Sequence, residues 1–167
     1  MSEKEIVFSS KIKYDGIFSF KDFYKFCYEW LMEEVGFEVA ETKYKEKLAG
    51  TSKNIDIEWK CESKVTDYFK FEGKVTFVIK DLIDVEATQG GAKIKSNKGS
   101  IEIGVKGTLI RDYNGKFETT AFKKFLRSIY EKWVIASRIE QFEDKLASDL
   151  DEFLAQAKSY LDLEGKK

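Results

Sequence analysis

The chain has 167 residues, of which 29 are lysine or arginine, 30 are aspartate or glutamate and none is histidine, so its formal net charge is −1. This length accommodates one domain with one hydrophobic core. Without histidine, the sequence excludes a Ser/His/Asp triad, a Cys/His dyad and every metal site that uses imidazole. It also contains no glycine-rich phosphate-binding motif. We therefore favour a non-enzymatic protein with no catalytic residue, metal or cofactor; an enzyme that works through carboxylates and tyrosines is the alternative that stays open.

The first predicted helix covers residues 19–35. Ser19 suits the N-cap, and Phe18 and Phe23 occupy the two ends of a hydrophobic staple. Apolar side chains then recur at three- and four-residue spacing until Gly36, which suits the C-terminal end of a helix. These signals predict both ends of the helix.

Beyond this helix the apolar period changes to two, which predicts an antiparallel meander rather than βαβ units. With a first strand before the helix, the curved sheet would have five or six strands. Glycine-containing turns are expected at residues 89–91, 96–99 and 114–115. The predicted strands lie near residues 4–14, 37–39, 55–61, 69–80, 83–88 and 101–113.

The last predicted element is a helical pattern over residues 118–161 that no proline or glycine interrupts. About 42 residues would extend roughly 63 Å at 1.5 Å each. A compact domain of this length has a diameter of roughly 40 Å. We therefore expect either that residues 138–163 overhang the body or that the helix breaks near Ser137 or at 147–148.

The two cysteines, Cys27 and Cys61, lack C-x-x-C spacing and fall on apolar sides of predicted elements. We expect both to be buried thiols in a reducing compartment, with a disulfide between them as the alternative. No stretch approaches the roughly 20 apolar residues of a membrane-spanning helix, and the N-terminus lacks an apolar signal segment. We expect a cytoplasmic protein.

The order strand, helix, antiparallel meander and long C-terminal helix resembles that of the START/pollen-allergen-like helix-grip superfamily. The resemblance covers most of residues 4–150, although one predicted helix stands where that superfamily usually has two short ones. It implies a single α+β domain over residues 1–167, with a sheet wrapped around the last helix and a cavity for a lipid, sterol or other apolar ligand. A cystatin-like or nuclear-transport-factor-like arrangement is the alternative.

Binding of an apolar small molecule between sheet and helix is the first function that we expect. Large inward side chains could instead fill this space, whereas Gly73 and Gly107 on the inward faces would leave room. A filled core and a cavity both stay open. The candidate ligand-binding residues are Trp59, Tyr68, Phe69, Phe71, Phe77, Tyr113, Phe122, Phe125 and Trp133.

The second expected function, in another class, is protein interaction through the C-terminal helix, either with a second copy or with a partner. Burial of the same apolar stripe in the protein's own core is the alternative. The candidate contact residues are Ile139, Phe142, Leu146, Leu150 and Phe153.

Charge is unevenly distributed along the chain. Residues 88–132 carry ten lysines and arginines against four acids, and residues 140–164 carry two lysines against eight acids. The two segments could attract each other, or the acidic one could meet a basic partner. With only three arginines, nucleic-acid binding is not favoured. The acidic half of the last helix argues against binding to a membrane surface.

Overall fold

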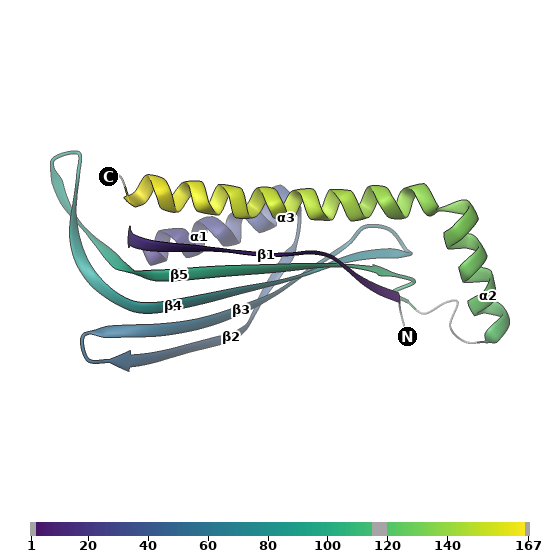
Figure 1. The fold of residues 1–167 in the computed structure, drawn as a ribbon, viewed down its shortest axis with the longest axis horizontal. Coiled ribbons are helices and arrows are strands. Elements are labelled where there is room, and N and C mark those ends of the chain that lie inside the picture. The colour runs from purple at the N-terminus through teal and green to yellow at the C-terminus, as the bar shows by residue number, and fades with distance from the viewer. Residues whose placement is uncertain (1–2, 115–119, 166–167) are drawn as a thin grey trace.

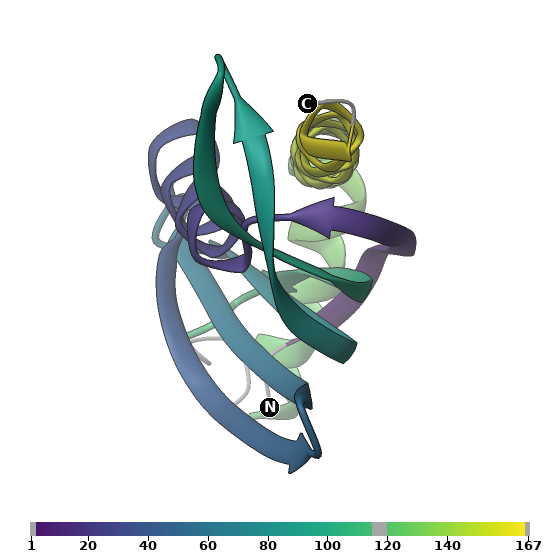
Figure 2. The ribbon, with the colours of Figure 1, turned by 90° about the vertical axis from the view of Figure 1, so that its left-hand side faces the viewer.

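A computed structural model describes residues 3–114 and 120–165 of the chain. Within these residues, five antiparallel strands form one curved sheet, and two helices lie on the same side of it (Figures 1 and 2). This confirms the predicted class, a single α+β domain with a long C-terminal helix packed on the sheet. In chain order the elements are β1 (Glu3–Phe18), α1 (Phe20–Trp30), β2 (Glu38–Ala49), β3 (Ser52–Lys64), β4 (Phe69–Gln89), β5 (Ala92–Arg111), α2 (Ala121–Ile129) and α3 (Ala136–Gly165).

The strand order is β1-β5-β4-β3-β2, so the meander β2 to β5 is extended by the first strand of the chain. Alternation of apolar and polar side chains places one face of each central strand in the core. The turn expected at residues 89–91 is confirmed. Gly90 and Gly91 adopt positive φ values of 60° and 82°, which other residues rarely reach without strain.

The turn expected at residues 96–99 is not present, because β4 and β5 form one long hairpin that passes through this segment. The pairing is irregular opposite it, where Asp81 has a φ of 56°. Asn97 uses its amide to fasten the hairpin: its Nδ2 donates to Asp84 at 2.9 Å, and its Oδ1 accepts from the backbone N–H of Phe20 at 3.1 Å. The polar residues that suggested a turn therefore tie the hairpin to the start of α1.

Helix α1 begins where predicted, and together with its π-helical continuation it reaches the predicted end. The hydroxyl of Ser19 accepts from the backbone N–H of Asp22 at 3.4 Å, and the rings of Phe18 and Phe23 meet edge to face at 6.3 Å. A π-helical segment, Leu31–Val35, continues the helix as far as Gly36, whose φ of 83° ends it.

The helical pattern of residues 118–161 is divided in two close to Ser137, one of the two places where a break is predicted. A π-helical segment, Tyr130–Val134, continues α2, and the chain then turns at the buried Ile135. Helix α2 runs across the end of the sheet, whereas α3 lies along β1 and β5 (Figure 1). Because α3 is only 30 residues long, residues 138–163 follow the sheet and do not overhang it; they are buried at intervals as far as Leu161.

Candidate functional site

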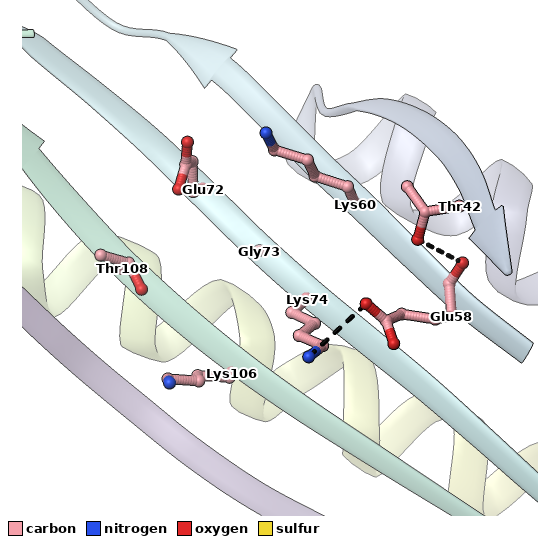
Figure 3. A pocket seen from close by; sticks show the side chains of 8 residues that line it. All are labelled: Thr42, Glu58, Lys60, Glu72, Gly73, Lys74, Lys106 and Thr108. Atoms are coloured by element: carbon pink, nitrogen blue, oxygen red, sulfur yellow. Dashed lines mark hydrogen bonds and ion pairs between the residues drawn. The ribbon is translucent and has the colours of Figure 1, made fainter.

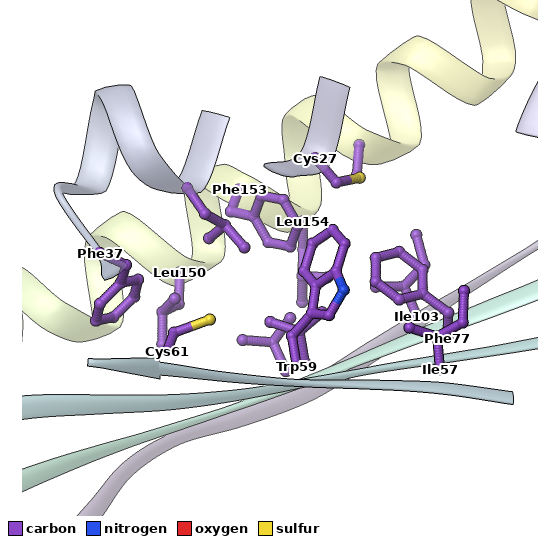
Figure 4. Close-up of a cluster of buried hydrophobic side chains, with 14 of the residues drawn as sticks. Cys27, Phe37, Ile57, Trp59, Cys61, Phe77, Ile103, Leu150, Phe153 and Leu154 are labelled. Carbon is purple, nitrogen blue, oxygen red and sulfur yellow. The ribbon is translucent and has the colours of Figure 1, made fainter. Parts of the chain in front are cut away.

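Four of the predicted ligand-binding residues lie on the sheet and are buried beneath the helices. The rings of Trp59 and Phe77 are 4.7 Å apart, and Phe69 contacts Phe142 of α3 at 4.8 Å. The indole N–H of Trp59 donates to the hydroxyl of Tyr24 at 3.2 Å. Figure 4 shows Trp59 and Phe77 rising from the sheet toward the helices. The four residues are Trp59, Phe69, Phe71 and Phe77.

The two inward glycines are covered by side chains. A Cβ on Gly107 would lie 2.4 Å from Cδ1 of Leu150, and a Cβ on Gly73 would lie 3.4 Å from the ring of Phe37. Contacts this short mean that leucine and phenylalanine side chains occupy the room that the glycines leave. At these two positions the interior is packed.

The predicted partner-binding stripe of α3 faces the protein's own sheet. Its last three members are fully buried, and Ile139 and Phe142 are half-buried against the same core. The stripe therefore serves the alternative role, burial in the core. The fully buried members are Leu146, Leu150 and Phe153.

The other predicted residues lie elsewhere. Tyr68 and Tyr113 are half-buried in the segments before β4 and after β5. Phe122, Phe125 and Trp133 lie on α2 and its π-helical continuation, with 68%, 59% and 73% of their surface exposed. The structure does not bring these three aromatic side chains to the sheet residues with which they were grouped.

Residues 121–134, here called the α2 segment, present a continuous apolar surface to solvent. Leu126 and Ile129, 39% and 40% exposed, lie at helical spacing between the three aromatic side chains. Thr120 caps the helix by accepting from the backbone N–H of Lys123 at 3.1 Å. We define the outward face of α2 as Phe122, Phe125, Leu126, Ile129 and Trp133.

The opposite side of the α2 segment is polar and faces the body. Arg127 Nη1 lies 3.4 Å from Asp112 Oδ2, and these side chains are only 11% and 2% exposed. Glu131 lies 3.5 Å from Arg111 Nη1 and accepts a short hydrogen bond from the Tyr68 hydroxyl. These ionic contacts, here called the anchor, hold α2 with its charges inward and its apolar side chains outward.

Ring contacts and electrostatics reinforce the anchor. The ring of Tyr130 meets that of Tyr68 edge to face at 5.5 Å. Burial, the hydrogen bond to Glu131 and nearby carboxylates raise the pKa of the Tyr68 hydroxyl, so it stays a hydrogen-bond donor throughout the physiological pH range. Asp112 adopts a φ of 51°, an uncommon backbone conformation that directs the chain out of β5 at this point.

Sequence reasoning missed Leu126 and Ile129 as exposed residues and all the ionic members of the anchor. It placed the apolar side of residues 122–136 against the sheet and expected the exposed apolar stripe on residues 138–161 instead. The available signal was the pair Arg127 and Glu131, four residues apart on the polar side of the segment, together with Arg111 and Asp112 at the end of a predicted strand.

The outer face of the sheet has a shallow hollow of about 320 Å³ (Figure 3). Three lysines and two glutamates line it, and Lys74 lies 3.5 Å from Glu58. The hydroxyl of Thr42 donates a hydrogen bond to the backbone carbonyl of Glu58 at 3.1 Å. Mixed charges of this kind are typical of a solvated sheet face, so the outward face of α2 is the stronger candidate site.

In residues 3–114 and 120–165, no three acidic or cysteine side chains gather in a way that could hold a metal ion. None of the helices in this part of the chain is long and apolar enough to cross a bilayer. Comparison with known proteins gives no match, either to a protein-family model or to a curated protein.

Proposed function

We propose that the protein is a docking module that associates reversibly with another surface through the outward face of α2. The observation that carries this proposal is the orientation of the helix, with its charged side buried in the body and its apolar side in solvent. Folding alone would favour the reverse, because burying a large apolar side chain stabilises a protein by about 1.5–3 kcal/mol. An apolar surface held outward by buried ion pairs is available for association.

The anchor also prepares the helix for binding. A helix of 14 residues is marginal on its own in water, so it would normally have to fold as it binds. Here the cap at Thr120 and the ion pairs of Arg127 and Glu131 hold it in place beforehand. Preorganisation of this kind lowers the entropic cost of association.

Binding of an apolar ligand between sheet and α3 stays a prediction. Such a ligand would have to displace Leu150 from above Gly107 or separate Phe69 from Phe142, which now contact each other. The outward face of α2 requires no such displacement, so docking is the function that the geometry favours.

Retention on a phenyl resin tests whether this face is accessible to another surface. The apolar variant carries Phe122→Ser, Phe125→Ser and Trp133→Ser. The matched control carries Ile6→Ser, Leu48→Ser and Leu163→Ser, whose side chains are 57%, 75% and 62% exposed but lie on three separate elements. We expect the apolar variant to elute well before both the native protein and the control. Equal retention of the apolar variant and the native protein would refute the proposal.

A further inference from the structure

We infer that the surface bound by the outward face of α2 is an anionic lipid bilayer. This inference rests on the proposed docking function and assigns its partner. The first argument is charge: Lys123, Lys124 and Lys132 are exposed in the α2 segment, while Glu131, its only carboxylate, is directed inward to Arg111. The exposed charges of the α2 segment itself are therefore entirely positive.

The kinds of side chain fit the boundary between lipid headgroups and acyl chains. Helices that lie in this boundary combine phenylalanine, leucine and tryptophan on one side with lysine or arginine on the other. Lys132 lies over the ring of Trp133, with Nζ 5.3 Å from the ring centre. Tryptophan favours the headgroup level, and the flexible lysine stem lets the ammonium group reach lipid phosphates while the ring inserts.

Most of the acidic residues of the C-terminal region lie far from this contact. Residues 118–161 are not one helix: the chain turns at Ile135, and α3, which carries the acidic residues, leads away along the sheet (Figure 1). Five of the eight acids of residues 140–164 lie at Asp149 or beyond, at least about 20 Å from the start of α3 at a rise of 1.5 Å per residue. For these five the distance exceeds the screening length of about 8 Å at physiological ionic strength.

The same charges disfavour a second copy as the occupant. A symmetric dimer through α2 would place Lys123, Lys124 and Lys132 of one protomer near the same residues of the other. Like charges brought together across an interface oppose association. An anionic surface instead attracts all three lysines at once.

Flotation of the full-length protein with lipid vesicles tests the inference. One set of vesicles is phosphatidylcholine, and the other contains 30 mol% phosphatidylglycerol. Because each lysine near an anionic surface contributes about 1 kcal/mol, we expect at least about tenfold stronger partitioning into the anionic vesicles. The preference should fade between 0.1 and 1 M salt, as the screening length falls from about 10 Å to about 3 Å.

Two charge variants distinguish the effect of the lysines in the α2 segment from the effect of the protein's net charge. The α2 charge variant carries Lys123→Glu, Lys124→Glu and Lys132→Glu. The control carries Lys43→Glu, Lys45→Glu and Lys47→Glu, which make the same change in net charge on the exposed strand β2. We expect the α2 charge variant and the apolar variant to lose binding to anionic vesicles at least about tenfold, whereas the β2 control retains most of it.

The outcomes distinguish this inference from the docking proposal. Equal binding to both vesicle types, or equal loss in the α2 and β2 charge variants, would overturn the lipid assignment. The lipid assignment would also fail if the protein bound no vesicles but the phenyl resin still retained it through α2. The docking proposal would then remain valid with another partner. A dimer in sedimentation that the apolar variant abolishes would assign the face to a second copy. Circular dichroism and urea unfolding of each variant confirm that it is folded.

Discussion

The carboxylate of Asp112 lies 3.4 Å from the guanidinium of Arg127 and joins the end of β5 to the inward side of α2. Both side chains are almost completely buried, so the opposite charge beside each one helps its own charge to be tolerated. This pair decides which side of α2 meets solvent, and it is the first contact to test.

We expect Asp112→Asn to lower the free energy of unfolding by about 3 kcal/mol, because it removes the carboxylate charge that lies beside the buried guanidinium of Arg127. Asparagine keeps the shape of the side chain and tolerates the positive φ of this position. Urea unfolding measures the loss. Asp81→Asn is the matched control, because Asp81 also has a positive φ but is exposed. Equal stability of the two variants would show that the ion pair contributes little.

The close approach of α3 to β5 makes a second prediction. Since a Cβ at position 107 would lie 2.4 Å from Leu150 Cδ1, Gly107→Ala should destabilise the protein by about 1–3 kcal/mol through overpacking. Combining it with Leu150→Ala should cost less than the sum of the two single changes, because the second substitution removes the clashing methyl group. Strictly additive losses in thermal or urea unfolding would argue against this contact.

Both thiols should be unreactive in the folded protein. Cys27 and Cys61 are free and fully buried, and burial raises the pKa of Cys61 to about 12 and that of Cys27 well above its ordinary value. The reactive thiolate is therefore scarce at neutral pH. A thiol reagent should modify neither cysteine in buffer and both in denaturant. Rapid labelling of either cysteine in the native protein would contradict the packing described here.

Glu143 of α3 should make stability depend on pH. Partial burial and the neighbouring Glu5 raise its pKa above the ordinary 4.5, so the folded state favours the protonated form. The protein therefore loses stability as pH rises from the ordinary pKa through the raised one, and the loss persists at neutral pH. We expect Glu143→Gln to stabilise the protein at pH 7 by less than about 1 kcal/mol, since the site is partly solvated.

The same substitution should have no effect below pH 4, where both states carry the proton. Urea unfolding at the two pH values measures this difference. Glu140→Gln, an exposed position on the same helix, is the control. A stabilisation of equal size at both pH values would assign the effect to helix propensity rather than to the charge of Glu143.

Local spacing in the sequence determined much of the fold. The cap at Ser19 and the stop at Gly36 bounded the first helix, and alternation identified the buried faces that include Trp59 and Phe77. These features depend on residues a few positions apart, so the sequence contains all the information needed to predict them. The fold class followed from the order of such elements.

The tertiary structure alone decided the features that involve distant partners. Residues 96–99 look like a turn, yet Asn97 finds its partners in β4 and α1 and the strand continues. The C-terminal pattern has no proline or glycine at which to break; its length left an overhang, a break near Ser137 and a break at 147–148 open, and the structure turns at Ile135. Amphipathic spacing shows that a helix has an apolar side, but not which side faces the body. For α2 the buried charges of Arg111 and Asp112 decide it, because each requires an opposite charge and only the polar side of the helix supplies one.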